Sequence, residues 1–298
     1  MVLMNRPCVD SAEHARQRQA ELQIDYSLSQ QYAVETLSAL AAGRYRAESG
    51  VWVEWAADVA AARDAAVSIP PEVEVPPPAR RFPVTTVTVA NATSLAAARA
   101  MHDAGRTPLV LNMANGATPG GGFRHGSRAQ EEFLCRGSAL YATIEGDPMY
   151  DAHRAQGGYE SSDWAILSPR VPVFRDDTAR TLGRPWSCAF LTCAAPVATR
   201  VGQPRSAELM EARIRRVLGI AAAHGFADLV LGAWGCGAFG NDATATAQSF
   251  RESFGGPFEG AFDQVVFAVT DWSPERRFLG PFRDAFPALG PEPPEHGA

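Results

Sequence analysis

From about residue 84 onward, short runs of β-branched residues alternate with longer stretches of helical periodicity, and this alternation constrains the fold more than any other feature. Such a pattern predicts a mostly parallel sheet, because each helix carries the chain back across the sheet before the next strand begins. The predicted strands are 85–89, 108–113, 171–175, 187–192, 228–231 and 264–269. The predicted helices are 94–103, 129–143, 207–224, 244–254 and 281–286.

The chain before residue 84 differs in composition and in the spacing of its apolar residues. Residues 10–66 are rich in Ala, Gln, Glu and Arg, and apolar residues such as Trp52, Trp55 and Val59 recur at helical spacing, which predicts helices. A run of prolines between 69 and 83 cannot continue a helix and predicts a connector, either loose or packed. We therefore expect an N-terminal helical extension with a Pro-rich connector (1–83), an α/β domain (84–287) and a disordered tail (288–298).

Charge and cysteine content exclude several classes of protein. A net charge of −6 and a pI near 5.6 provide no global basic field, so we expect no direct nucleic-acid binding. The five cysteines are scattered and lack the spacing of a disulfide framework or a zinc site, which predicts free thiols in the cytoplasm. No apolar segment has the length of a signal peptide or a membrane span. We expect a monomer without a bound metal.

A glycine-rich loop follows the strand predicted at 108–113, where open parallel sheets bind their ligands. It contains, in order, Gly120, Gly121 and Gly122, then seven other residues, then Gln130, Glu131 and Glu132. Three successive glycines cost conformational entropy that packing does not return, so they suit a place where backbone passes close to a ligand. A flexible surface loop is the alternative for the glycines, and capping of a helix is the alternative for the acidic pair.

A second glycine-rich loop, at 232–241, follows a later predicted strand. Its backbone N–H groups, together with the start of the next helix, are suited to bind a pyrophosphate. Gly235, Gly237 and Gly240 also fit the dinucleotide fingerprint G-x-G-x-x-G, with Asp271 as a ribose-binding acid, so an NAD-dependent oxidoreductase is a rival interpretation. Only one further strand follows this loop, whereas a Rossmann domain needs additional βαβ units after its fingerprint.

Taken together, the two loops resemble those of a known family. The Gly-Gly-Gly and Gln-Glu-Glu loop resembles the signature of the poly(ADP-ribose) glycohydrolases, and the loop at 232–241 resembles the diphosphate-binding loop of the bacterial-type members. The resemblance covers about 84–286. It implies a macrodomain-like, three-layer α/β/α fold with a mostly parallel mixed sheet, and the N-terminal helical extension also suits the bacterial type.

The resemblance also implies an activity. The family hydrolyses ribose–ribose O-glycosidic bonds in poly(ADP-ribose) and releases ADP-ribose without a metal or another cofactor. Poly(ADP-ribose) and ADP-ribosylated proteins are the implied substrates, and the response to DNA damage is the implied setting. Carried over by resemblance, Glu132 is the catalytic acid and Glu131 fixes the ribose hydroxyls at the scissile bond.

The remaining residues implied by the resemblance bind the substrate or support the loops. Gln130 belongs to the support of the first loop, and Phe239 covers the ribose near the diphosphate. The others are Asn112, Asn115, Gly120, Gly121, Gly122, Gly235, Cys236, Gly237, Ala238, Gly240, Asn241, Thr270 and Asp271. Turn formation is the alternative role for Asn115, which precedes a glycine, and core or rim packing is the alternative to adenine stacking for Trp272.

The implied chemistry fits a carboxylic acid. Cleavage through an oxocarbenium-like transition state requires a proton on the leaving oxygen, which Glu132 supplies if it stays protonated near neutral pH. We expect burial, Glu131 and the pyrophosphate to raise its pKa, against the helix dipole. The same carboxylate can then activate water. A reader of ADP-ribose without turnover and a mono-ADP-ribosyl hydrolase are rival functions, but a reader needs no proton donor.

Overall fold

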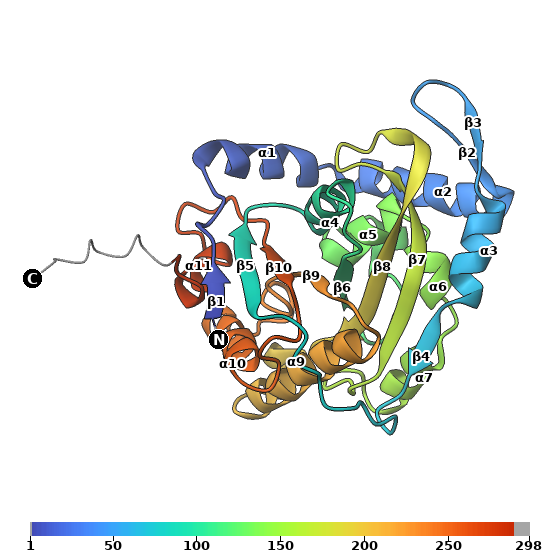
Figure 1. The fold of residues 1–298 in the computed structure, drawn as a ribbon. Coiled ribbons are helices and arrows are strands. Elements are labelled where there is room, and N and C mark those ends of the chain that lie inside the picture. Colours follow the sequence, from blue (N-terminus) through green and yellow to red (C-terminus); the bar gives the residue numbers. More distant parts are fainter. Residues whose placement is uncertain (1, 289–298) are drawn as a thin grey trace, which may run out of the picture.

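An eight-stranded mixed sheet forms the middle layer of the computed structural model, which describes residues 2–288 (Figure 1). The strand order across it is β1 (Val2–Asn5), β5 (Val84–Ala90), β10 (Gln264–Ala268), β9 (Asp228–Leu231), β6 (Leu109–Ala114), β8 (Thr181–Ala194), β7 (Ala165–Arg175) and β4 (Val67–Ile69). The strands from β1 to β8 in this order are parallel, whereas β7 runs antiparallel to both β8 and β4. The carboxyl ends of five neighbouring strands, from β5 to β8, therefore meet at one end of the sheet.

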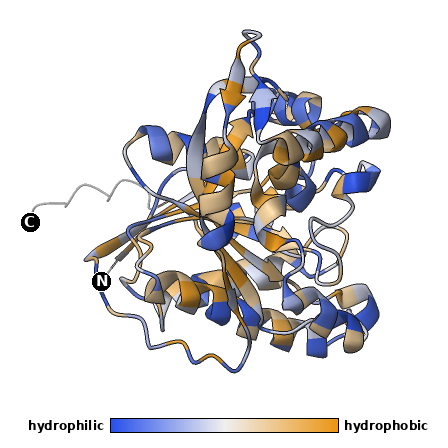
Figure 2. Ribbon diagram, turned by 90° about the vertical axis from the view of Figure 1, so that its right-hand side faces the viewer, coloured by the Kyte–Doolittle hydropathy of each residue, from blue (hydrophilic) through white to orange (hydrophobic). Residues whose placement is uncertain are grey.

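Helices cover both faces of the sheet. Leu109 and Leu111 of β6 belong to one hydrophobic core and Val110 belongs to the other, because successive side chains of a strand point to opposite faces. The first core is closed by α9 (Arg205–Ala223), α10 (Ala243–Gly255) and α11 (Leu279–Ala285). The second is closed by α2 (Tyr26–Ala42), α3 (Ala56–Asp64), α4 (Ser94–Asp103), α5 (Gln130–Gly137), α6 (Leu140–Ile144) and α7 (Pro148–Ala155). Figure 2 shows hydrophobic residues concentrated on the central strands and hydrophilic residues on the outer parts.

The α/β part of the chain agrees closely with the sequence pattern. Each predicted strand lies in the sheet, and α4 and β9 begin and end where predicted. The helix predicted at 129–143 is divided into α5 and α6, because Ser138 forms a β-bridge with Val173 and its hydroxyl accepts a hydrogen bond from the N–H of Leu140. The short helices α7 and α8 (Ala198–Val201) were not predicted.

The N-terminal part is not helical throughout. The prediction is correct for α1 (Ala12–Leu22), α2 and α3, but wrong between them, where β2 (Arg44–Arg46) and β3 (Trp52–Glu54) form an antiparallel hairpin. Trp52 is exposed on this hairpin, whereas Trp55 is buried, so the two do not share a helix face. The strands β1 and β4 of this part occupy the two edges of the main sheet.

The Pro-rich connector is a packed strap. Arg216 of α9 donates hydrogen bonds to the carbonyl oxygens of Pro70 (2.8 Å) and Val73 (2.7 Å). Further along, the backbone N–H groups of Arg81 and Phe82 both donate to the carbonyl of Gly260. The packed alternative is therefore the one observed. Of the tail predicted at 288–298, residues 289–298 lie outside the described part of the chain.

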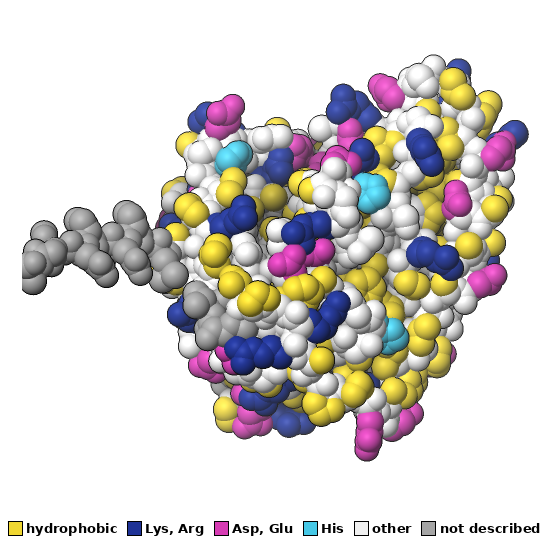
Figure 3. Space-filling view, viewed as in Figure 1, with side chains coloured by type: hydrophobic (Ala, Val, Ile, Leu, Met, Phe, Trp, Pro, Cys, Tyr) yellow, Lys and Arg dark blue, Asp and Glu magenta, His cyan; other side chains and the backbone are white. Residues whose placement is uncertain are grey.

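The surface carries charges of both signs. On the face shown in Figure 3, acidic and basic side chains are interspersed rather than gathered into an extended patch of one sign. None of the helices within residues 2–288 is long and apolar enough to cross a membrane.

Phe267 of β10 tests the first core. Its buried ring lies 4.9 Å from that of Phe286 and 5.1 Å from that of Phe282. We expect Phe267→Ala to lower the free energy of unfolding by about 3–5 kcal/mol, because buried apolar contacts are lost and a cavity remains. Val51→Ala, at an exposed position, should change it by less than about 0.5 kcal/mol. Urea unfolding of both variants measures the difference, and equal losses would contradict the described packing.

Candidate functional site

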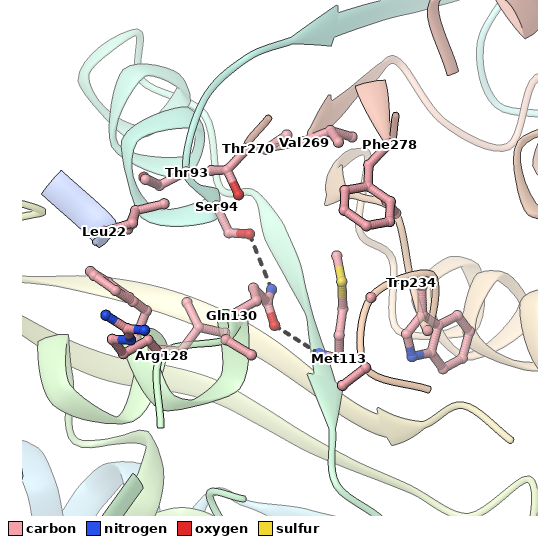
Figure 4. Close-up of a pocket in the computed structure, with 18 of the residues that line it drawn as sticks. Leu22, Thr93, Ser94, Met113, Arg128, Gln130, Trp234, Val269, Thr270 and Phe278 are labelled. Carbon is pink, nitrogen blue, oxygen red and sulfur yellow. Dashed lines mark hydrogen bonds between the residues drawn. The ribbon is translucent and has the colours of Figure 1, made fainter. Parts of the chain in front are cut away.

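A cavity of about 340 Å³ opens where the parallel strands end. We call it the strand-end cavity. The segments after β5, β10, β9, β6 and β8 all contribute to its walls, as do the start of α5 and the end of α1. Figure 4 shows the side chains of Thr93, Ser94, Gln130 and Phe278 around it. Its position is the one that open parallel sheets use for ligands.

Gln130 attaches the first turn of α5 to β6. Its Oε1 accepts a hydrogen bond from the N–H of Met113 (2.9 Å), and its Nε2 donates to the carbonyl of Leu111 (2.7 Å) and to Oγ of Ser94 (3.1 Å) (Figure 4). One side chain thus connects α5, the sheet and the start of α4. The two glutamates that follow Gln130 are held in place by this connection.

Glu131 is buried, with 3% of its surface exposed. Its Oε2 accepts a hydrogen bond from the N–H of Asn115 (2.7 Å), and its Oε1 accepts one from Nδ2 of Asn112 (3.4 Å). The pKa of Glu131 is raised to about 8, mainly by burial and also by the neighbouring charge of Glu132, against the hydrogen bond from Asn115. Burial therefore outweighs the helix dipole at this position, and Glu131 is mostly protonated at neutral pH.

Glu132 is also buried, with 7% of its surface exposed. Its Oε1 accepts a hydrogen bond from the N–H of Gly122 (2.8 Å). Its Oε2 has no hydrogen-bond partner among the residues that the structure describes. One oxygen of this carboxylate is therefore fixed by the loop, whereas the other has its hydrogen-bonding capacity unused inside the protein.

The glycines of the first loop are required by close approach to neighbouring side chains, which at Gly121 are the two carboxylates. Gly121 has a φ of +58°, and a Cβ atom there would lie 2.4 Å from Oε1 of Glu132 and 3.0 Å from Oε2 of Glu131. A Cβ on Gly122 would lie 2.1 Å from Oγ of Ser127. Gly120 also has a positive φ, of +70°. The loop is therefore an ordered cover of the carboxylates rather than a loose surface segment.

The second loop presents backbone donors to the strand-end cavity. Gly237, Ala238 and Phe239 line the cavity, and their three consecutive N–H groups have no hydrogen-bond acceptor within residues 2–288. No atom lies within 4 Å of the place where a Cβ on Gly237 would be, so a ligand can reach the backbone there. Consecutive free N–H groups form a concavity for an anion.

Other residues of this loop hold its shape. Nδ2 of Asn241 donates to the carbonyl of Pro196 (2.8 Å) and to that of Gly235 (3.1 Å). We expected the start of α10 to contribute to anion binding, but the carboxylate of Asp242 already accepts the N–H of Ala245 there (2.8 Å). This cap uses one donor of the first turn of α10. Gly240 has a φ of +73° and packs against Thr199.

Several residues predicted to touch a ligand also have partners within the protein. Oδ1 of Asn115 accepts the N–H groups of Ala117 (2.8 Å) and Thr118 (2.9 Å), which is the turn alternative. Nδ2 of Asn112 also donates to Thr192, while its Oδ1 is buried without a partner in the described chain. Burial raises the pKa of Cys236 to about 12, which leaves a protonated thiol and argues against a nucleophile.

The segment after β10 forms the opposite wall of the strand-end cavity. Thr270 lines the cavity, as does Trp272, which is 39% exposed. The buried carboxylate of Asp271 accepts hydrogen bonds from Ser273, from the N–H of Phe278 (2.7 Å) and from the N–H of Leu279 (3.1 Å). Asp271 thus shapes the 271–279 segment, and the ribose-binding acid of the dinucleotide interpretation is not free for that role.

Two lining residues gave no signal in the sequence. Leu22 comes from α1 and Asp177 from the turn between β7 and β8. Arg128 also lines the cavity, and its guanidinium donates to the carbonyl of Ile24. These residues come from parts of the chain whose proximity only the tertiary fold establishes. Within the described residues, no group of three or more His, Cys, Asp or Glu side chains is arranged to hold a metal ion.

Comparisons with known proteins relate this geometry to one family. Residues 33–176 match the family model of the microbial-type PARG catalytic domain. The chain is similar to the crystal structure of poly(ADP-ribose) glycohydrolase (PARG) from Thermomonospora curvata, with 39% identity, a TM-score of 0.80, and coverage of 87% of this chain and 100% of that chain. That enzyme was also solved bound to the inhibitor ADP-HPD.

A second similar structure contains a nucleotide. It is poly(ADP-ribose) glycohydrolase from Deinococcus radiodurans in complex with ADP-ribose, with 39% identity, a TM-score of 0.73, and coverage of 78% of this chain and 98% of that chain. A comparison with curated protein sequences gave no match.

Asp177 provides a test of the electrostatics of the cavity wall. Burial raises its pKa to about 6, and the charge of Glu21 contributes, against a hydrogen bond from Thr93 (2.6 Å). Because the pKa of this acid is higher in the folded protein, its effect on stability becomes unfavourable as pH rises from about 4 to 6. Relative to wild type, we expect the free energy of unfolding of Asp177→Asn to rise by about 2–3 kcal/mol between pH 4 and pH 7.5. Urea unfolding at both pH values measures this, and a difference independent of pH would contradict it.

Proposed function

Because this chain belongs to the family of microbial-type poly(ADP-ribose) glycohydrolases, we propose that it hydrolyses the ribose–ribose O-glycosidic bonds of poly(ADP-ribose) and releases ADP-ribose. It is a glycosidase whose chemistry is carried by a carboxylate. The observation that carries the assignment to residues is the state of Glu132, which is buried with Oε1 fixed by Gly122 and Oε2 unpaired. An unpaired buried carboxyl oxygen is costly for folding alone, but it is what a proton donor to a bound substrate needs.

We place the diphosphate of a terminal ADP-ribose unit on the second loop. The free N–H groups of Gly237, Ala238 and Phe239 support this, because they offer three donors to phosphate oxygens. Phe239 then lies next to the ribose that follows the diphosphate. The strand-end cavity, at about 340 Å³, falls within the usual size of nucleotide and drug-sized pockets.

In the proposed reaction, both proton transfers occur at Glu132. The carboxylic acid donates its proton to the leaving ribose oxygen as the bond from that oxygen to the anomeric carbon breaks. The resulting carboxylate then accepts a proton from the water that attacks the anomeric carbon, so Glu132 returns to its initial state. This scheme uses no metal. Because Glu131 is protonated below about pH 8, it adds no second charge when Glu132 becomes anionic.

The other predicted site residues fall into two proposed roles. Glu131, Thr270 and the donors of the second loop contact the substrate, with Glu131 at the ribose hydroxyls. The rest hold those groups in position: Asn112, Asn115, Gly120, Gly121, Gly122, Gln130, Gly235, Cys236, Gly240, Asn241 and Asp271. ADP-ribosylated proteins as substrates, a monomeric state, the cytoplasm as location and a role in the DNA damage response stay predictions from the sequence.

The central test is Glu132→Gln, which keeps the shape of the side chain and removes its acidic proton. We expect ADP-ribose release from purified poly(ADP-ribose) to fall at least about 100-fold, because general acid–base catalysis contributes at least that much. Binding of ADP-ribose, measured by calorimetry, should persist. Glu48→Gln, at an exposed position of the β2–β3 hairpin, is the matched control and should keep wild-type activity. If neither wild type nor the variant cleaves while both bind, the protein is a reader of ADP-ribose.

A second test separates the carboxylate contact at Gly121 from backbone strain. Gly121→Ala and Gly146→Ala both place a side chain at positive φ, +58° and +80°, but only at Gly121 would the new Cβ meet a carboxylate. We expect backbone strain to lower the stability of both variants by about 1 kcal/mol, with a further loss in Gly121→Ala because its Cβ also displaces a buried carboxylate. Only Gly121→Ala should lose activity, by more than about tenfold, because it displaces Glu132. Equal activity of the two variants would show that the loop does not position the catalytic group.

A further inference from the structure

A second cavity, of about 410 Å³, lies beside the first, and we call it the α1 cavity. It is enclosed by α1, α2, α5 and the turn between β7 and β8. Leu95, Phe133 and Asp177 line both cavities and therefore separate them. The proposed reaction does not use the α1 cavity.

One wall of the α1 cavity contains two buried arginines, Arg136 and Arg175, with 3% and 4% of their surface exposed. Arg136 donates from Nη1 to the carbonyl of Ser127 (2.6 Å), but its Nη2 has no partner in the described chain. Arg175 donates from Nη1 to the carbonyl of Arg136 (3.0 Å) and from Nη2 to Glu35 (2.9 Å), while its Nε is likewise unpaired. Each guanidinium therefore keeps a buried donor without an acceptor, which is costly.

The two cations also repel each other. Burial lowers the pKa of Arg136 to about 10; the charge of Glu132 opposes this shift, and the charge of Arg175 adds to it. Glu35, the ion-pair partner of Arg175, is 44% exposed, so it compensates only part of the buried charge. An anion between the two guanidinium groups would satisfy both unpaired donors and relieve the repulsion.

The α1 cavity is also lined by carboxylate acceptors. Oε1 of Glu21 pairs with Arg18 (2.7 Å), whereas its Oε2 is buried and unpaired within residues 2–288. Oδ2 of Asp177 accepts the hydroxyl of Thr93, whereas its Oδ1 is also buried and unpaired. The neighbouring Asp176 is engaged by Arg180 and Thr178. Two unpaired carboxylate oxygens are suited to receive hydroxyl donors.

We propose that the α1 cavity binds a phosphorylated pentose, with its phosphate at Arg136 and Arg175 and its hydroxyls at Glu21 and Asp177. Both halves of such a ligand are needed to use the unpaired groups. A bare phosphate would satisfy the arginines, yet it would leave the carboxylates unpaired and be repelled by them. A neutral sugar would leave the buried cations uncompensated.

The pentose phosphate has two sources: a further unit of the polymer whose end occupies the strand-end cavity, or a free sugar phosphate. The first source rests on the proposed function, whereas binding itself does not. Calorimetry with ribose 5-phosphate on protein saturated with ADP-ribose tests binding while the strand-end cavity is filled. We expect ribose 5-phosphate to bind at least about tenfold more tightly than inorganic phosphate, and unphosphorylated ribose not to bind.

Two variants locate the binding. Ala20→Trp fills the α1 cavity from α1 and should abolish binding of ribose 5-phosphate, whereas Gln19→Trp, on the same helix but outside the lining, should preserve it. Glu21→Gln should weaken the binding of ribose 5-phosphate by about tenfold without weakening the binding of inorganic phosphate, because only the sugar hydroxyls contact this side chain. Absence of ribose 5-phosphate binding to wild type, or equal binding to the two Trp variants, would overturn the proposal.

Chain length distinguishes the sources. If the ligand is part of the polymer, Ala20→Trp should raise KM several-fold for chains of three or more units and leave KM for the dimer unchanged. If the ligand is a free sugar phosphate, KM should stay unchanged for both substrates while binding of ribose 5-phosphate is lost. Failure of wild type to hydrolyse the polymer would contradict the proposed function only, because the pair of Trp variants locates the binding without turnover.

Discussion

The removal of two adjacent carboxyl groups from water at the start of α5 is the constraint on which the site depends. Burying charge is costly unless hydrogen bonds or a proton compensate it, and both occur here. Glu131 retains a proton near neutral pH, and the N–H groups of Asn115 and Gly122 each approach one glutamate. Because these donors belong to the loop after β6, that loop must lie close against the start of α5. Glycines are required there because the loop backbone passes too close to neighbouring side chains for a Cβ atom.

Much of this arrangement was accessible from the sequence because it is local. The alternation of β-branched runs with stretches of helical periodicity identified the strands and helices of the α/β part. Both glycine-rich loops were then located by the strands that precede them. What the sequence did not reveal depends on distant partners: β1 and β4 join the sheet edges, and Leu22 and Asp177 reach the cavity from opposite parts of the chain. Asn115 and Asp271 are residue types that often contact ligands, yet their side-chain oxygens accept hydrogen bonds from the protein's own backbone. Only the structure shows which polar groups already have hydrogen-bond partners within the protein. This distinguishes residues that support the site from residues that are free to bind a ligand.

The two cavities differ in what remains unused around them. In the strand-end cavity the unpaired groups include three consecutive backbone donors of the second loop, which suit an anionic ligand. Around the α1 cavity they are guanidinium and carboxylate atoms of the lining residues. Leu95, Phe133 and Asp177 form a wall that the two cavities share. A ligand in either cavity therefore contacts residues that also line the other cavity.

The pairing of the sheet edges has a consequence for the order of folding. Val67 of β4 pairs with Leu167, and Thr86 of β5 pairs with Gln264, so strands synthesised early must wait for partners made much later. Contacts of such sequence separation make folding slow, and the strands that wait have exposed edges. During synthesis, the first 83 residues therefore leave the ribosome before they have a sheet to join. The last central strand to leave the ribosome, β10, completes the sheet and with it the wall of the strand-end cavity.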